Sequence, residues 1–254
     1  MPITALLLRA RTVRPSIAFV VREGFRREGL FIYRLRENGL RVAIRHRTGD
    51  VVTLGEVFHE HDYRPPPELS HELTQVRNIV DLGANIGLFG AFAVATWPEA
   101  EIVAFEPDPA NADVHGQTIA INALQARWSL VRAAAGSRAG QARFVAGDIA
   151  LSRLAGASDD GVPSIEVSVE DVIPRMAEAD LVKMDIEGGE WAILNDPRFQ
   201  GLPPRALVLE YHPQFCSARN PREAVEAALG AAGLRVQSIW HRADGHGMLW
   251  AWRS

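Results

Sequence analysis

Short apolar runs alternate with longer mixed segments through the chain after residue 69. The runs are rich in Ile, Leu and Val and are bounded by glycine, proline or acidic residues, as buried strands of a parallel sheet are. The predicted strands cover residues 79–82, 101–107, 128–134, 142–147, 180–188 and 206–213. The predicted helices between and after them cover residues 87–97, 109–124, 168–176, 190–196 and 221–234.

This alternation of strand and helix predicts a doubly wound, Rossmann-like α/β sandwich. Residues 235–241 and 247–253 flank the turn ADGHG and predict a C-terminal antiparallel strand pair. Ligands of doubly wound sheets bind above the carboxyl ends of the strands. Functional residues are therefore expected at those ends.

Residues 1–68 predict a smaller N-terminal extension. Its first 25 residues are basic and partly amphipathic, which predicts a leading helix, and residues 31–46 predict a β-hairpin that turns at Asn38-Gly39. Residues 51–58 show apolar alternation, which predicts a further strand. The stretch RPPPELS, residues 64–70, holds three consecutive prolines and predicts an extended connector to a domain of residues 69–254. The extension is expected to form a lid, a substrate platform or a contact between protomers.

Composition narrows the classes of partner. Hydrophobic residues make up 47% of the 254 residues, and the formal net charge is −4, so no overall positive field attracts nucleic acid. The N-terminal apolar run is far shorter than the ~20 residues of a membrane helix, which predicts no membrane span. Cys216 is the single cysteine and cannot form an intrachain disulfide. A cytoplasmic location is expected on this ground.

The stretch VDLGANIGLFG, residues 80–90, predicts a ligand-binding turn between the first strand of the domain and its helix. Gly83 and Gly87 lack Cβ atoms, so a ligand can approach the backbone, and the helix start offers free N–H groups. Glu106 ends the following strand, where a carboxylate can accept both hydroxyls of a ribose. The glycine turn and Glu106 together predict an adenosine-containing ligand. The alternative is a turn with only a structural role and a solvated Glu106.

The charge of Asp81 bears on which adenosine ligand binds. A dinucleotide turn has a third glycine where the pyrophosphate crosses the helix start, and this turn has none in that register. Asp81 repels a pyrophosphate but attracts the ammonium and sulfonium groups of S-adenosylmethionine. We therefore expect S-adenosylmethionine rather than NAD.

Six stretches resemble, in this order, motifs of the FkbM-like family of class I S-adenosylmethionine-dependent methyltransferases: VDLGANIGLFG, AFEPDPAN, the region of Asn122, AAAGSRAG, VKMDIEGGEW and LVLEYHP. The resemblance spans residues 48–213, including the upstream TGD, and KMDIEGGE is its most specific part. It implies a class I methyltransferase sandwich that methylates oxygen. The cofactor contacts that it implies are Asp81, Gly83, Ala84, Asn85, Gly87 and Glu106, with the adenine near Ala134.

Polar side chains gather where the strands 180–188 and 206–213 end. Alternation puts Lys183 and Asp185 on one side of their strand and Glu210 and His212 on one side of theirs, with Glu187 following. His212 is the predicted general base because imidazole accepts protons near neutrality, and Asp185 is the second candidate. A structural ion network around Lys183 is the alternative. The oxygens of Asp185, Glu187 and Glu210 suit magnesium, but no spacing demands a metal, and none is favoured.

Together these features predict a methyltransferase that uses S-adenosylmethionine and acts on a hydroxyl of a small molecule, sugar or natural product. The expected partner is a small-molecule or glycan acceptor, with no nucleic acid. Three alternatives stay open at this point: an N-methyltransferase acting on a small molecule or peptide, an NAD-dependent oxidoreductase, and a non-catalytic cofactor-binding protein.

Overall fold

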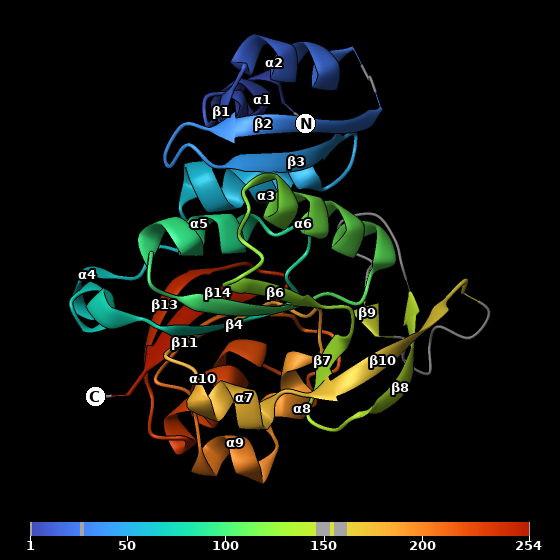
Figure 1. The fold of residues 1–254 in the computed structure, drawn as a ribbon. Helices are drawn as coiled ribbons and strands as arrows, with labels where there is room; N and C mark the ends of the chain where they lie inside the picture. Colours follow the sequence, from blue (N-terminus) through green and yellow to red (C-terminus); the bar gives the residue numbers. More distant parts are fainter. Residues whose placement is uncertain (1, 26–27, 146–152, 155–161, 254) are drawn as a thin grey trace.

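A seven-stranded sheet forms the centre of the protein. The computed structural model describes residues 2–25, 28–145, 153–154 and 162–253 (Figure 1). The sheet has the order β13-β14-β12-β11-β4-β5-β6, in which β12, β11, β4, β5 and β6 run parallel and β14 runs antiparallel to both of its neighbours. The strands are β4 (Asn78–Leu82), β5 (Glu101–Phe105), β6 (Trp128–Val131), β11 (Leu181–Met184), β12 (Ala206–Tyr211), β13 (Arg235–His241) and β14 (Gly247–Trp252). The predicted doubly wound sandwich with its C-terminal antiparallel pair is confirmed.

Alternate strand residues pack into two cores, one on each face of the sheet. In β4, Ile79 joins one core and Val80 the other, and Leu181 and Val182 divide in the same way in β11. Figure 1 shows α5 and α6 on one face and α7 to α10 on the other. These helices are α5 (Leu88–Thr96), α6 (Pro109–Ile121), α7 (Ile173–Glu178), α8 (Glu190–Leu194), α9 (Pro197–Gly201) and α10 (Pro221–Ala231). Burial on both faces explains why the parallel strands are almost wholly apolar.

The N-terminal extension packs over α6. It comprises α1 (Ile3–Ala10), β1 (Val13–Arg14), α2 (Ser16–Gly24), β2 (Gly29–Leu35) and β3 (Arg41–His46). The predicted hairpin is confirmed as β2 and β3. The predicted single leading helix is instead two helices, separated by residues 11–15, which include β1. Asn122, which follows α6, accepts a hydrogen bond from the Arg41 amide, and Thr118 accepts one from the Ala43 amide. These bonds hold the first half of β3 against the C-terminal end of α6.

Residues 51–58 are helical rather than extended. They form α3 (Asp50–Gly55) and the π-helix η1 (Glu56–Glu60). Val51, Leu54 and Val57 recur at intervals of three and are all buried, so the apolar positions follow a helical period rather than the alternation of a strand. The proline connector also differs from the prediction, since α4 (Pro67–Ser70) begins at the third proline and η2 (Glu72–Gln75) follows it. Proline is tolerated in the first turn of a helix because the N–H it lacks has no partner there.

A second, four-stranded sheet projects from the main one. Its order is β7-β10-β8-β9, with β7 (Ala134–Gly136), β8 (Gly140–Val145), β9 (Arg153–Leu154) and β10 (Ile165–Asp171). The strand predicted at 142–147 corresponds to β8, except that 146 and 147 lie outside the described residues. The first half of the helix predicted at 168–176 is wrong, because it belongs to β10 and pairs with β8. No helix in the described part of the chain is long and apolar enough to cross a membrane.

Candidate active site

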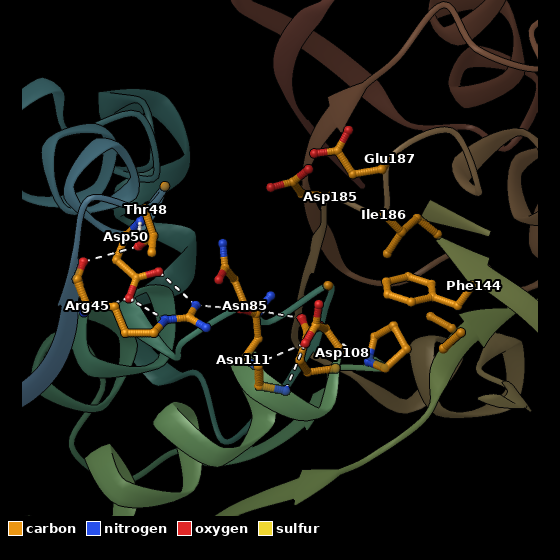
Figure 2. Close-up of a pocket in the computed structure, with 17 residues that line it drawn as sticks. Arg45, Thr48, Asp50, Asn85, Asp108, Asn111, Phe144, Asp185, Ile186 and Glu187 are labelled. Atoms are coloured by element: carbon orange, nitrogen blue, oxygen red, sulfur yellow. Dashed lines mark hydrogen bonds and ion pairs between the residues drawn. The ribbon is translucent and has the colours of Figure 1, made fainter. Parts of the chain in front are cut away.

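A pocket opens at the carboxyl ends of β4, β5 and β11, and three parts of the chain wall it (Figure 2). The glycine turn and the loop after β5 form its floor, β7 and β8 supply Ala134 and Phe144, and the extension supplies Arg45 and Thr48. The N-terminal extension is therefore a wall of the pocket and not a distant appendage.

The glycines of the turn have different roles. Gly83 lies at φ +74° and lines the pocket, and a Cβ there would lie 1.8 Å from the Asp185 carbonyl oxygen. Gly87, at φ +85°, packs against His115, whose ring carbon Cδ2 would lie 2.6 Å from an added Cβ. Gly87 therefore serves helix packing and lies outside the pocket lining, as Ala84 does. Among the residues predicted to contact the cofactor, Gly83, Asn85, Glu106 and Ala134 line the pocket.

Glu106 is fixed by two backbone amides. The Asn85 amide donates to its Oε2 at 2.7 Å, and the Asp108 amide donates to its Oε1 at 2.9 Å. Asp108 in turn caps α6 through its own side chain, which orders the loop between β5 and the helix. Burial raises the pKa of Glu106 to about 7, although the two amide bonds oppose the rise. The carboxyl group therefore lies in the pocket with one amide on each oxygen.

Asp81 faces a lysine rather than the pocket. It is 0% exposed, and its Oδ1 lies 3.6 Å from Nζ of Lys183. Burial raises the pKa of Asp81 to about 6, and Lys183 opposes the rise. Lys183 donates to the Gly83 carbonyl at 2.7 Å and lies 3.6 Å from Oδ2 of Asp185. Lys183 thus supports the glycine turn from below, which matches the alternative of a structural ion network.

The other four polar groups converge, as the alternation along β11 and β12 predicted. Nε2 of His212 lies 3.3 Å from Glu187 Oε2, 3.9 Å from Asp185 Oδ1 and 3.9 Å from Glu210 Oε1. On its other side, Nδ1 is 2.8 Å from Oε1 of Glu190, a residue of α8 that was not among the predicted site residues. One buried imidazole is therefore surrounded by four carboxylates.

This surrounding changes the protonation expected of His212. Burial lowers the pKa of the imidazole, but the hydrogen bond to Glu190 and the neighbouring carboxylates outweigh it and raise the pKa to about 10. Burial also raises the pKa of Glu187 to about 7 and that of Glu210 well above its usual range. His212 is consequently a cation near neutrality. The assignment of His212 as general base rested on the pKa of an isolated imidazole, which this site does not preserve.

Further residues of the site had no signal in the sequence. Arg45 makes a bidentate pair with Asp50 at 3.0 and 2.9 Å and donates to Asn111, so the extension is tied to α6 at the pocket wall. Phe144 and Ile186 lie together at the opposite end of the pocket from Arg45 (Figure 2). Neither was predicted as a site residue: Phe144 lies outside the quoted motifs, and Ile186 lies within KMDIEGGE but has no polar group.

Glu56 and Tyr63 belong to the neighbourhood of the carboxylate cluster. Burial and the charge of Asp185 raise the pKa of Glu56 to about 7. Tyr63 is buried, and burial together with Asp185 and Glu210 raises its pKa well above the usual range. The segment after α3 therefore adds a carboxylate to a cleft that is already acidic.

The order of the strands in the main sheet, with the pocket at their carboxyl ends, is that of the class I methyltransferase fold. The methyltransferase domain of METTL16 superposes with a TM-score of 0.52 at 13% identity, covering 97% of this chain and 79% of that chain. TYW2 of M. jannaschii, solved in complex with AdoMet, has a TM-score of 0.45 at 16% identity and covers 89% of this chain and 85% of its own.

Residues 81–231 match the model of the methyltransferase FkbM domain. The match covers more than half of the chain, which therefore belongs to the FkbM methyltransferase family. Among curated relatives, the methyltransferase sdnD of Sordaria araneosa is 50% identical over 44 residues. That alignment spans 17% of this chain and 17% of the relative's length.

Proposed function

We propose that this protein transfers a methyl group from S-adenosylmethionine to a hydroxyl of a small molecule, sugar or natural product. The observation that carries the proposal is how the carboxyl group of Glu106 is hydrogen-bonded in the pocket. An ionised carboxylate has about four acceptor positions, and the amides of Asn85 and Asp108 occupy two of them. The remaining two match the two neighbouring hydroxyls of a ribose. Membership of a methyltransferase family makes S-adenosylmethionine the nucleoside that best fits.

The two ends of the pocket suit the two ends of this cofactor. Phe144 and Ile186 offer apolar faces on which an adenine can pack, with Ala134 beside them. Asn85 and Asp185 line the pocket toward the carboxylate cluster, where the sulfonium would be attracted by negative charge. A pyrophosphate in the same position would be repelled. This arrangement supports a methyl donor over a dinucleotide.

The transfer itself is an in-line displacement. The acceptor oxygen bonds to the methyl carbon while the carbon–sulfur bond breaks, and its electron pair stays on sulfur as S-adenosylhomocysteine forms. The hydroxyl proton must leave, and we assign its removal to Asp185, which lines the pocket and has an oxygen facing the cluster. Protonated His212 is assigned the role of holding that carboxylate in place. Glu187, which lines the pocket beside Asp185, adds to the negative surroundings of the sulfonium.

Calorimetry with S-adenosylmethionine and S-adenosylhomocysteine tests the donor. Both should bind at a single site, and titration with NADH should give no heat of binding. Absence of binding by both sulfur compounds, or binding of NADH in their place, would overturn the proposal. A panel of hydroxyl and amine acceptors with methyl-labelled donor then separates O-methylation from N-methylation. Binding without transfer to any acceptor would favour a non-catalytic cofactor-binding protein.

A further inference from the structure

A group of metal-ligating atoms lies beside the pocket, at the ends of β11 and β12. One oxygen each of Asp185 and Glu187 and one ring nitrogen of His212 lie within 4.8 Å of one another. From Nε2 the distances are 3.3 Å to Glu187 Oε2 and 3.9 Å to Asp185 Oδ1. Adjacent ligands of a small divalent cation are about 3.0 Å apart when each bond is about 2.1 Å long. Both distances from Nε2 would therefore need to shorten by less than about 1 Å to reach ligand spacing.

The imidazole is held as a metal ligand would be. His212 is 3% exposed, and its Nδ1 is fixed at 2.8 Å from Oε1 of buried Glu190. Metal-binding histidines commonly use their second nitrogen in this way, because the carboxylate sets the ring orientation. Nε2 points into the cluster, where its nearest oxygen is Oε2 of Glu187 at 3.3 Å. Nε2 therefore faces the same two carboxylates, Asp185 and Glu187, that a cation in this position would use as ligands.

The cluster is closed on one side and open on the other. The His212 side chain is 4% exposed, whereas those of Asp185 and Glu187 are 24% and 30% exposed. Both carboxylates line the cofactor pocket and lie side by side at its edge (Figure 2). Asp185 directs Oδ2 toward Lys183 and Oδ1 toward His212, so one of its oxygens is available to the cluster. The open side faces the space into which an acceptor would enter.

We propose that Asp185, Glu187 and His212 bind a divalent cation, and that this cation coordinates the hydroxyl that is methylated. The second half of this statement rests on the proposed function. Bound to Nε2, the cation takes the place of the proton there. As a Lewis acid the cation stabilises the acceptor in its deprotonated form. With the cation bound, Asp185 serves as a ligand in place of the base assigned above, and the released proton passes to solvent. Acceptors whose hydroxyl has a second oxygen on the neighbouring atom, such as vicinal diols or hydroxy acids, can chelate the cation and are the expected substrate class.

Manganese(II) is the probe of choice, because it accepts both carboxylate and imidazole ligands and is paramagnetic. The metal-free protein is titrated with Mn²⁺ without any methyl donor, and free metal is followed by electron paramagnetic resonance. We expect one Mn²⁺ per chain, a loss of affinity of at least about tenfold in Glu187→Gln and in Asp185→Asn, and a modulation from imidazole nitrogen in the spin-echo signal. Glu23→Gln is the matched control, because Glu23 pairs with His46 at 2.9 Å in the N-terminal extension. It should bind Mn²⁺ as the wild type does.

Two results would overturn the proposal: no binding of Mn²⁺ at millimolar concentration, or binding that neither cluster variant weakens. Measuring the binding of S-adenosylhomocysteine in the presence of a chelator distinguishes failure of the metal site from failure of the proposed function. If the nucleoside binds and Mn²⁺ does not, the methyl donor site stands and the metal site is wrong. If amine acceptors are methylated in chelator, the cluster serves a cationic substrate and the metal site is again wrong. If Mn²⁺ binds as expected and the nucleoside does not, the metal site stands and the proposed function fails.

Discussion

Replacing Glu106 by glutamine tests the cofactor site most directly, because the structure specifies how this carboxyl is used. One amide donates to each of its oxygens, which leaves two acceptor positions in the ionised form and only one when a proton is bound. Full acceptance of two ribose hydroxyls therefore requires the ionised carboxylate. Binding of S-adenosylhomocysteine is expected to remove a proton from Glu106.

The magnitude follows from the pKa of about 7, which burial causes. The ionised fraction of such a group is about 0.1 at pH 6 and about 0.9 at pH 8. If only the ionised form binds, the apparent Kd of S-adenosylhomocysteine should be about tenfold higher at pH 6 than at pH 8. At pH 7 binding should release about half a proton, which calorimetry in buffers of different ionisation enthalpy measures directly.

Glu106→Gln removes this titration and one charge-assisted hydrogen bond. The variant should bind S-adenosylhomocysteine more weakly by about 1.5–3 kcal/mol at pH 8, a factor of about 10 to 150. Other groups near the pocket also titrate or carry charge: Asp81, Asp108, Asp185, Glu187, Glu56, Arg45, Lys183 and His212. Because they are present in both proteins, the test is the difference between wild type and variant. Glu101→Gln, at the exposed start of β5, is the control and should change neither affinity nor proton release.

Equal proton release by wild type and Glu106→Gln would refute the reasoning, and so would equal affinity at pH 8. The first result would mean that Glu106 is already ionised in the unloaded protein or stays neutral in the complex. The second would mean that the ribose lies elsewhere.

Three further predictions concern stability. Gly83→Ala should destabilise the fold by more than about 3 kcal/mol in urea unfolding, because the added Cβ would lie 1.8 Å from a backbone oxygen and the residue has a positive φ. The control is Gly116→Ala on α6, where an added Cβ meets open space, and this variant should be neutral or stabilising. Lys183→Met should cost about 3–5 kcal/mol, since it leaves Asp81 buried without its cation, and a second change of Asp81→Asn should recover most of that loss. Glu56→Gln should stabilise the protein at pH 8, by at most about 3 kcal/mol, and leave it unchanged below pH 4.5. The variant is stabilised because a pKa of about 7 for Glu56 in the folded protein means that the wild type loses stability as pH rises from 4.5 to 7. A variant whose stability depends on pH as that of the wild type does would contradict this prediction.

The sheet and its ligand-binding edge could be predicted because they depend on local patterns. Short apolar runs between helices specify a doubly wound sheet, and Glu106 follows from its place after the second of those strands. Strand alternation also predicted that Asp185, Glu210 and His212 would converge, because these residues share a side of two strands that are neighbours. The helix at residues 51–58 was missed because Val52 and Leu54 alternate as in a strand, and eight residues are too few to separate the two periods.

The pairing of Asp81 with Lys183 could not be predicted, because it depends on register. Residue 81 of β4 lies directly opposite residue 183 of β11, and a shift of one position would have turned Lys183 to the other face of the sheet. The protonation of His212 was equally out of reach. It depends on Glu190, which α8 brings to within 2.8 Å of the ring.

The charge argument for the methyl donor survives, but it rests on different residues from those that suggested it. Asp81 is compensated by Lys183 and lies outside the pocket lining, so it contributes little field to a ligand. The negative charge that a ligand meets comes instead from Asp185 and Glu187, which line the pocket. These carboxylates exceed the positive charge of the single imidazole they surround, and an unmatched cluster of this kind favours a cationic occupant. A sulfonium at the pocket side and a divalent cation at the acceptor side would each reduce that excess, whereas a pyrophosphate would add to it.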